Sequence, residues 1–231
     1  MRLNAEQAKE LLFQDVISSP EDLMRDKNRW VNHCVNVGEA AGRIAAQMGL
    51  DSDFAEAEGY LHDIGRKVSH QDHVMAGYHY LVNLGYGDMA RSCLTHSFVD
   101  NDINLVAGGV LPFSEQQRLF SCFDSHLPGE NILCPCNDYD NIIQLCDLFC
   151  LDTGFTTLEN RLLDVYSRKG IFSNTRDHFQ SVFQLKQKIE DKMGCSLYSL
   201  FPEISEEEKE SANEDHHKIG ELMGRSAIKK R

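Results

Sequence analysis

Apolar residues recur every three or four positions along most of this sequence, and that spacing places side chains on one face of an α-helix. The clearest stretch lies between residues 20 and 48, where one stripe contains Trp30, Cys34, Val37, Ala41, Ile44 and Met48. Glycines and prolines separate such stretches, and strand-like alternation joined by hairpin turns does not recur. The sequence therefore predicts an all-α fold rather than one built on a β-sheet.

The helix boundaries follow from capping residues, glycines and prolines. Asn4 is expected to cap the first helix, Pro20 to open the second, and the third to start at residue 51 or 52 and carry the sequence GYLHDIG. Residues 99–137 are expected to be loops around one short helix. The first two helices are predicted at about 4–18 and 20–48. The helices after the third are predicted at about 72–84, 88–98, 114–125, 139–151, 157–169 and 175–193.

The chain has 231 residues, which is ample for a buried core. We predict one helical domain over residues 1–200, whose motif-bearing part is 30–152. Residues 201–231 are predicted to be a charged C-terminal helix or tail. We favour a solvated terminal helix or frayed tail over a docking element, because the segment is acidic over 203–215 and basic at its end.

The net charge is -13, from 36 acidic and 23 basic residues. This balance argues against binding of long nucleic acid but leaves room for a small anionic substrate. No apolar run approaches the roughly 18–20 residues of a membrane helix, so no membrane partner is expected. Eight cysteines without an apolar secretory signal suggest free thiols and a cytoplasmic location. These features do not predict an oligomeric state.

Two carboxylates lie in apolar surroundings. Asp147 is flanked by Leu145, Cys146, Leu148 and Phe149, and His62-Asp63 follows the sequence GYL. A buried carboxylate without a partner costs several kcal/mol, so each aspartate needs an arginine, a lysine or a metal ion.

Three further histidines, His33, His73 and His96, also lie in or at the ends of apolar helical stretches. Each one taken singly is more often a hydrogen-bonded core residue than a ligand. Together with His62 and the two apolar-embedded aspartates they favour a metal site. Imidazole and carboxylate are natural ligands of Zn, Fe, Mn and Co, and a metal would satisfy all of them at once.

This ordered set resembles the HD superfamily of metal-dependent phosphohydrolases, in its six-ligand form with two metal ions. The set is His33, His62, Asp63, His73, His96 and Asp147. The stretch Leu61–Arg66 is similar to the central motif of that superfamily, and His73 with Gly77 is similar to its H-x-x-x-G helix. The resemblance spans residues 30 to 152.

The resemblance implies a compact helical bundle, here with extra C-terminal helices, and two divalent ions chosen from Fe, Mn, Co or Zn. One ion would be held by His33, His62, Asp63 and Asp147. The other would be held by Asp63, His73 and His96, with Asp63 bridging. Because Asp63 and His73 are close in sequence, His79 or His70 could replace His73.

The implied reaction is hydrolysis of a small phosphate ester, such as a nucleotide or dinucleotide, by a metal-activated hydroxide. Asp63 and Arg66 would be the catalytic residues, and Arg66 and Lys67 would bind the phosphorylated substrate, with Arg66 contacting the substrate anion rather than a carboxylate. The alternatives are a mixed-valent di-iron oxygenase acting on a small organic anion and a regulatory module without catalysis.

Other residues of ligand type are interpreted without a metal. Cys134-Pro135-Cys136 lacks a second cysteine pair at zinc-site spacing. His126 is expected in an exposed loop, and His216-His217 in the charged tail.

Overall fold

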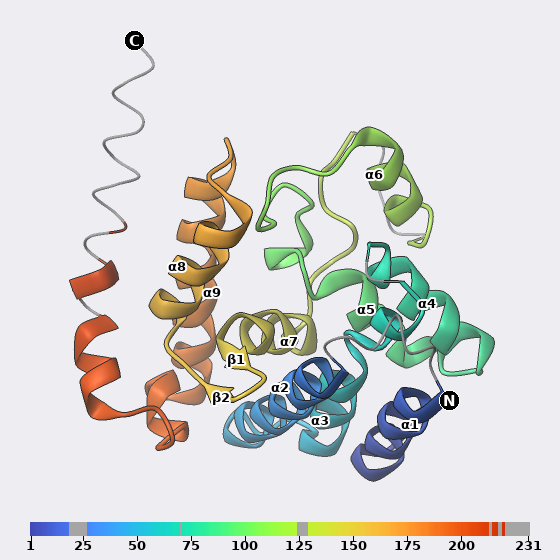
Figure 1. Ribbon diagram of the computed structural model, residues 1–231, viewed down its shortest axis with the longest axis horizontal. Coiled ribbons are helices and arrows are strands. Elements are labelled where there is room, and N and C mark those ends of the chain that lie inside the picture. The colour runs from blue at the N-terminus through green and yellow to red at the C-terminus, as the bar shows by residue number, and fades with distance from the viewer. Residues whose placement is uncertain (19–26, 70, 124–128, 213, 217–218, 220–231) are drawn as a thin grey trace.

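Helices account for most of the regular structure in the computed structural model, which describes residues 1–18, 27–69, 71–123, 129–212, 214–216 and 219. The α-helices are α1 Ala5–Ser18, α2 Lys27–Gln47, α3 Ser52–Leu61, α4 His73–Asn83, α5 Arg91–Thr95, α6 Phe113–Phe120, α7 Asp138–Phe149, α8 Leu158–Lys169 and α9 Thr175–Met193 (Figure 1). The short 3₁₀ helices are η2 Ile64–Lys67, η3 Gly87–Met89, η4 Val99–Asn101 and η5 Leu197–Leu200. The predicted all-α class is confirmed.

The ends of the first two helices follow the local signals. The backbone N–H of Gln7 donates to Asn4 Oδ1 at 2.8 Å, and the backbone N–H of Asn4 donates to Gln7 Oε1 at 3.1 Å, which is a reciprocal cap. Gly49 follows α2 with φ of 71°, a conformation that stops a helix. The predicted start of the second helix at Pro20 lies outside the described residues.

Three local predictions need correction. The third helix ends at Leu61, so most of GYLHDIG lies beyond it. Helices α5 and α6 are 5 and 8 residues long, shorter than predicted, because the chain turns into 3₁₀ or irregular structure on either side. A two-residue antiparallel hairpin, β1 Cys150–Leu151 with β2 Gly154–Phe155, follows α7, and the sequence analysis did not foresee it.

The interior contains a large apolar cluster shared by α2, α7, α8 and α9, and smaller clusters beside α1 and beneath α6. Helices α2 and α3 pack at glycines: a Cβ built on Gly59 would lie 2.5 Å from Gly38 Cα. Only glycine permits this backbone approach. The contact sets the position of the C-terminal end of α3 against α2.

The segment that follows residue 200 packs against the bundle, beside α8 and α9 (Figure 1). Phe201 and Ile204 are buried, and Glu208 accepts hydrogen bonds from the Thr157 backbone N–H at 3.1 Å and from Asn160 Nδ2 at 3.0 Å. Burial of the apolar side chains at 201 and 204 anchors the start of this charged segment. Most residues of 205–211 are exposed, and the charged C-terminal helix or tail stays a prediction. Residues 220–231 lie outside the described residues.

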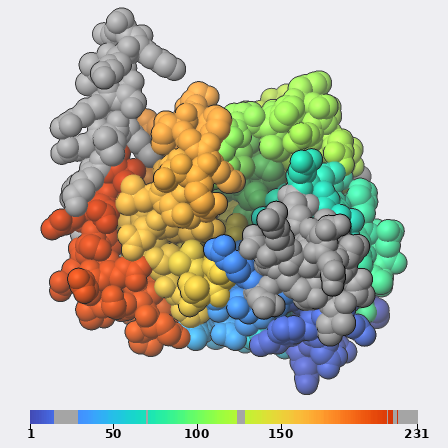
Figure 2. Space-filling model, in the orientation of Figure 1, coloured from blue at the N-terminus to red at the C-terminus, as the bar shows by residue number. Residues whose placement is uncertain are grey.

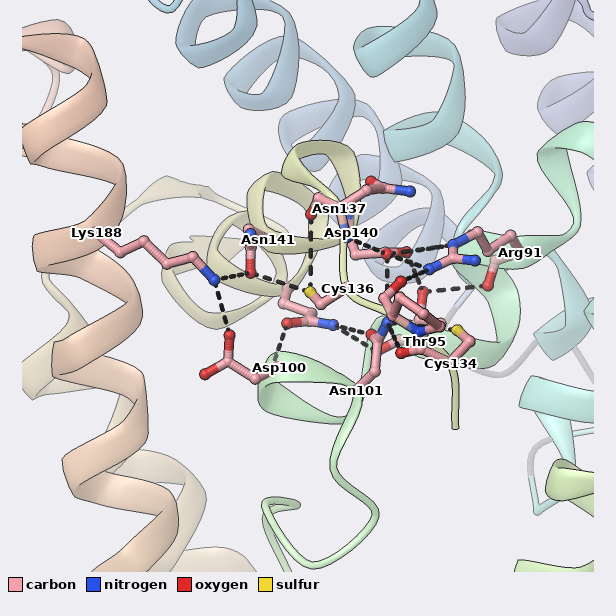
Figure 3. A network of polar contacts seen from close by, with 12 residues as sticks. Arg91, Thr95, Asp100, Asn101, Cys134, Cys136, Asn137, Asp140, Asn141 and Lys188 are labelled. Atoms are coloured by element: carbon pink, nitrogen blue, oxygen red, sulfur yellow. Dashed lines mark hydrogen bonds and ion pairs between the residues drawn. The ribbon is translucent and has the colours of Figure 1, made fainter. Parts of the chain in front are cut away.

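A buried polar network joins α5, η4 and α7 (Figure 3). Asp140 accepts hydrogen bonds from Arg91 Nη2 at 2.6 Å, Thr95 Oγ1 at 3.1 Å and Asn101 Nδ2 at 3.3 Å. One turn further along α7, Gln144 Nε2 donates to Asn101 Oδ1 at 2.7 Å, which gives η4 a second hydrogen bond to α7. The network fixes α5 and α7 relative to each other.

Among the described helices, none is long and apolar enough to cross a bilayer.

We expect Glu58 to make stability depend on pH. Burial, and then the nearby Asp140, raise the pKa of Glu58 to about 8. Between its ordinary pKa and about pH 8 the native state keeps this proton while the unfolded chain loses it, so the free energy of unfolding falls as pH rises. In Glu58→Gln this contribution is absent. The free energy of unfolding of the variant, relative to that of the parent, should rise by at least about 1.4 kcal/mol between about pH 5 and about pH 8, as measured by urea unfolding.

The matched control is Glu115→Gln, because Glu115 is exposed on α6. Its stability difference from the parent should not change with pH. An unchanged difference for Glu58→Gln across the same range would contradict the assignment of a protonated Glu58.

Candidate metal centre

The candidate site is a cavity of about 370 Å³ between α2, α4, α7 and α8. In Figure 2 the surface is hollowed beside α8, which is drawn in yellow-orange. Five of the six proposed ligands line this cavity, namely His33, Asp63, His73, His96 and Asp147. The sixth, His62, is buried behind them.

One triad combines His33 from α2, His62 after α3 and Asp147 from α7. The Nε2 atoms of His33 and His62 lie 3.0 Å and 3.7 Å from Asp147 Oδ1. One donor atom from each residue lies within 4.8 Å of the others, which is a spacing that a single metal ion can span.

The second triad combines Asp63 with His73 at the start of α4 and His96 after α5. The Nε2 atoms of His73 and His96 lie 3.3 Å and 3.7 Å from Asp63 Oδ1. The donor atoms again lie within 4.8 Å of one another. The two triads adjoin, since the rings of His62 and His96 are 5.1 Å apart between centroids.

Three of the histidines form a hydrogen bond between Nδ1 and a backbone carbonyl oxygen. The Nδ1 atoms of His33, His62 and His96 lie 3.2 Å from Cys150 O, 2.7 Å from Gly59 O and 3.1 Å from Ser92 O, respectively. A carbonyl only accepts, so Nδ1 carries the proton and Nε2 keeps its lone pair. This is the arrangement of a histidine that binds metal through Nε2.

Within the part of the chain that the structure describes, several buried polar atoms of the triads have no hydrogen-bond partner. They are His62 Nε2, Asp63 Oδ1 and both ring nitrogens of His73. Such atoms cost free energy unless a partner is supplied. Imidazole nitrogens around carboxylate oxygens are the donor set of Zn, Fe, Mn or Co. The residues present therefore fit divalent metal ions.

The protonation states also suit metal binding. Burial lowers the pKa of His96 to about 4 and also lowers the pKa of His73. Burial raises the pKa of Asp63, but Arg66 and then the histidines outweigh it and hold that pKa well below its ordinary value. At neutral pH the second triad is thus a carboxylate with neutral imidazoles, the forms that coordinate metal.

The end of α3 explains why His62 and Asp63 reach different triads. His62 still has helical angles, whereas Asp63 leaves the helix with φ of -109° and ψ of 13°. The structure groups Asp63 with His73 and His96, and His62 with His33 and Asp147. The bridging role of Asp63 stays a prediction.

Arg66 lines the cavity and its Nε donates to Asp63 Oδ2. The expectation that Arg66 faces a substrate instead of a carboxylate is therefore not what the structure shows: the guanidinium contacts Asp63 and also borders the cavity. Lys67 is not among the residues that line the cavity, and its Nζ lies 3.2 Å from the centroid of the Tyr80 ring. The geometry brings no support for substrate binding by Lys67.

The remaining sequence candidates lie elsewhere. His79 is exposed and contacts Tyr78, so His73 and not His79 joins the triad. His216 lies 5.3 Å from Phe179 between ring centroids. Cys134 is buried, and Cys136 contacts Asn141 at 3.2 Å. His70, His126 and His217 lie outside the described residues.

Four ionisable residues that the sequence analysis did not single out also line the cavity: Arg161, Arg168, Lys169 and His178. The first three belong to α8 and the last to α9. The spacing of Arg161 and Arg168, seven residues apart on one helix face, is a signal that was present in the sequence. The spacing alone could not show that this face of α8 lies toward the histidines of the cavity.

Residues 30–116 match the sequence model of the HD domain. This part of the chain is therefore similar to the HD domain, in agreement with the resemblance carried by its histidines and aspartates. The matched range includes every proposed ligand except Asp147, which lies beyond it.

Several curated proteins named Ribonuclease Y are similar to parts of the chain. The one from Streptococcus agalactiae serotype III is 33% identical over 134 residues, covering 56% of this chain and 23% of the relative. That from Clostridium botulinum strain Hall is 30% identical over 95 residues, covering 41% and 17%. That from Lactobacillus helveticus is 45% identical over 40 residues, covering 17% and 7%. The chain thus spans less than a quarter of these relatives. No solved structure matches the chain significantly.

A glycine contact places His73 beside Asp63. A Cβ built on Gly65, in η2, would lie 1.9 Å from the backbone oxygen of His73 and 2.4 Å from the backbone nitrogen of Gly77. We expect Gly65→Ala to push η2 and α4 apart, to cost about 1–3 kcal/mol or more in thermal unfolding, and to deplete metal from the second triad.

The matched control is Gly87→Ala, because a Cβ there meets no atom within 4 Å. It should leave stability and metal content close to those of the parent. A Gly65→Ala protein as stable as the Gly87→Ala protein, with full metal content, would contradict the proposed role of this contact.

Proposed function

We propose that this chain is a metal-dependent hydrolase of phosphate esters, acting on a nucleotide, a dinucleotide or another small phosphomonoester or phosphodiester. The observation that carries the proposal is the pair of adjoining His/Asp triads, whose buried and unpartnered donor atoms face a cavity lined by cations. The match of residues 30–116 to the HD domain supports the same reaction class.

Two divalent ions, one per triad, would supply activation of water at neutral pH and neutralisation of charge on the phosphoryl oxygens. His33, His62 and Asp147 would hold one ion. Asp63, His73 and His96 would hold the other. The backbone carbonyls that accept from Nδ1 of His33, His62 and His96 would keep the Nε2 of these three histidines directed at the ions.

Arg66 has two tasks in this proposal. Its contact with Asp63 orients the carboxylate, and its half-buried guanidinium borders the cavity where a phosphate would lie. Guanidinium binds phosphate oxygens through paired, charge-assisted hydrogen bonds.

The charge of the cavity favours an anionic substrate. Although the whole chain carries a net charge of -13, the cavity is lined by Arg66, Arg161, Arg168 and Lys169 against the carboxylates of Asp63 and Asp147. The relatives named Ribonuclease Y bear on the choice of substrate, because that name implies cleavage of RNA phosphodiesters. The linkage at the end of a short RNA belongs to the same class of substrate, and the overall acidity argues against extended contacts along a long nucleic acid.

We expect two metal ions per chain after reconstitution, measured by elemental analysis. His33→Ala should lower the metal content of the first triad and destabilise the protein, since binding of metal couples to folding. His73→Ala should deplete the second triad. His79→Ala is the control and should change neither quantity, because His79 is exposed. One ion or none in the parent, or unchanged content in both triad variants, would contradict a dinuclear centre.

We expect the protein loaded with Mn or Co to hydrolyse phosphate esters without oxygen, because the ions need only act as Lewis acids. Release of phosphate or of a nucleotide should be measured anaerobically over a panel of monoesters and diesters. Turnover that requires both iron and oxygen would instead establish the oxygenase alternative. No turnover by a fully loaded protein under either condition would favour a regulatory module.

A further inference from the structure

Helix α8 lies outside the region that matches the HD domain, yet it supplies three cations to the cavity. Its residues also border a second, outer cavity of about 880 Å³, which contains Arg29, Asn160 and residues of the β1–β2 hairpin. The two cavities share His33, Arg161 and Arg168. These residues therefore mark the passage from the metal centre to the outer cavity.

Arg161 is held by one ion pair, but one of its guanidinium nitrogens has no hydrogen-bond partner among the described residues. Its Nη1 lies 3.1 Å from Asp164 Oδ2, and only 21% of its side chain is exposed. Its Nε is buried and, among the described residues, has no hydrogen-bond partner. A buried guanidinium nitrogen without an acceptor is costly, and an anion entering the passage would remove that cost.

The neighbours of Arg161 leave a net positive charge at this point. Asp164 is shared with Arg168, whose Nη2 lies 2.6 Å from it, so one carboxylate faces two guanidinium groups. Lys169 donates to the Ala107 carbonyl at 3.1 Å, and that acceptor is neutral. His178 bonds the Tyr166 hydroxyl at 2.9 Å. Among the described cations of the two cavities, Arg161 is the one with a buried donor nitrogen that has no hydrogen-bond partner.

We propose that Arg161, assisted by Arg168, binds a second phosphate group of the substrate at the junction of the two cavities. The inference rests on the proposed phosphohydrolase function and narrows its substrate class. The reacting phosphate would lie at the triads, the second phosphate at Arg161, and the rest of the molecule in the outer cavity. Arg161 is then a specificity-determining residue that favours substrates with two phosphates over isolated monoesters.

Kinetics with matched substrates test this inference. Arg161→Gln should lower kcat/KM at least tenfold for substrates with two phosphates, here a nucleoside diphosphate and a 5′-phosphorylated dinucleotide, through the lost charge-assisted hydrogen bonds. It should change kcat/KM for p-nitrophenyl phosphate less than twofold. A loss confined to one of the two substrates identifies the spacing of the phosphates. Equal losses on all three substrates, or no loss, would overturn the proposal.

Two further variants separate specificity from folding. Arg161→Lys keeps the charge but not the planar fork, and it should recover part of the preference for two phosphates. Arg176→Gln is the matched control, because Arg176 is exposed on α9 and borders neither cavity. It should behave as the parent does. Circular dichroism should show the same helix content in all three proteins, and if Arg161→Gln does not fold, the Arg161→Lys comparison decides.

A binding measurement distinguishes failure of this inference from failure of the proposed function. Calorimetry with the metal-loaded protein should show tighter binding of methylenediphosphonate than of methylphosphonate, and Arg161→Gln should reduce that difference at least tenfold. If the binding difference is reduced in Arg161→Gln but the parent hydrolyses no phosphate ester, the proposed function is contradicted and the second phosphate site is supported. If the parent hydrolyses phosphate esters but the binding difference is unchanged in Arg161→Gln, the proposed function is supported and the second phosphate site is contradicted.

Discussion

The structure depends on one constraint: six imidazole and carboxylate groups converge inside an apolar bundle, where unpaired polar atoms are costly. They come from α2, the end of α3, the start of α4, the end of α5 and α7, so no single helix can satisfy them. Backbone carbonyls accept hydrogen bonds from Nδ1 of three histidines, and the Nε2 atoms of these histidines point toward the two aspartates. What remains unsatisfied is the set of atoms that a divalent ion binds.

The convergence requires close control over helix positions, and two kinds of contact provide it. Glycines allow backbones to touch, as Gly59 does at Gly38 and as Gly65 does at His73, so the segment with His62 and Asp63 is held between α2 and α4. The network around Asp140 joins α5 to α7 (Figure 3). Each of these helices positions a candidate ligand, since His96 follows α5 and Asp147 lies on α7. Both devices are typical of buried sites in which a small displacement would separate the ligands.

The chemistry and the selectivity of the proposed enzyme come from different parts of the chain. The range that matches the HD domain supplies five of the six candidate ligands and Arg66. Asp147 and the cations of α8 follow it. Helix α8 places three cations beside the site of a chain with a net charge of -13, and a local positive charge of this kind favours an anion. Changes in α8 could therefore alter the substrate without disturbing the metal ligands.

The sequence by itself determined the helical class, most helix boundaries, and the set of histidines and aspartates at the site. Helical periodicity, caps and the cost of burying a carboxylate are local properties that can be read from neighbouring residues. Only the tertiary structure decided how these residues divide into two triads, because the division depends on Asp63 leaving the helix one residue after His62. It also decided between His73 and His79, which lie on one helix and differ in the direction they face. The packing of residues 201–212 and the turning of Arg161 toward the cavity arise from contacts between segments distant in sequence, and local patterns carry no record of such contacts.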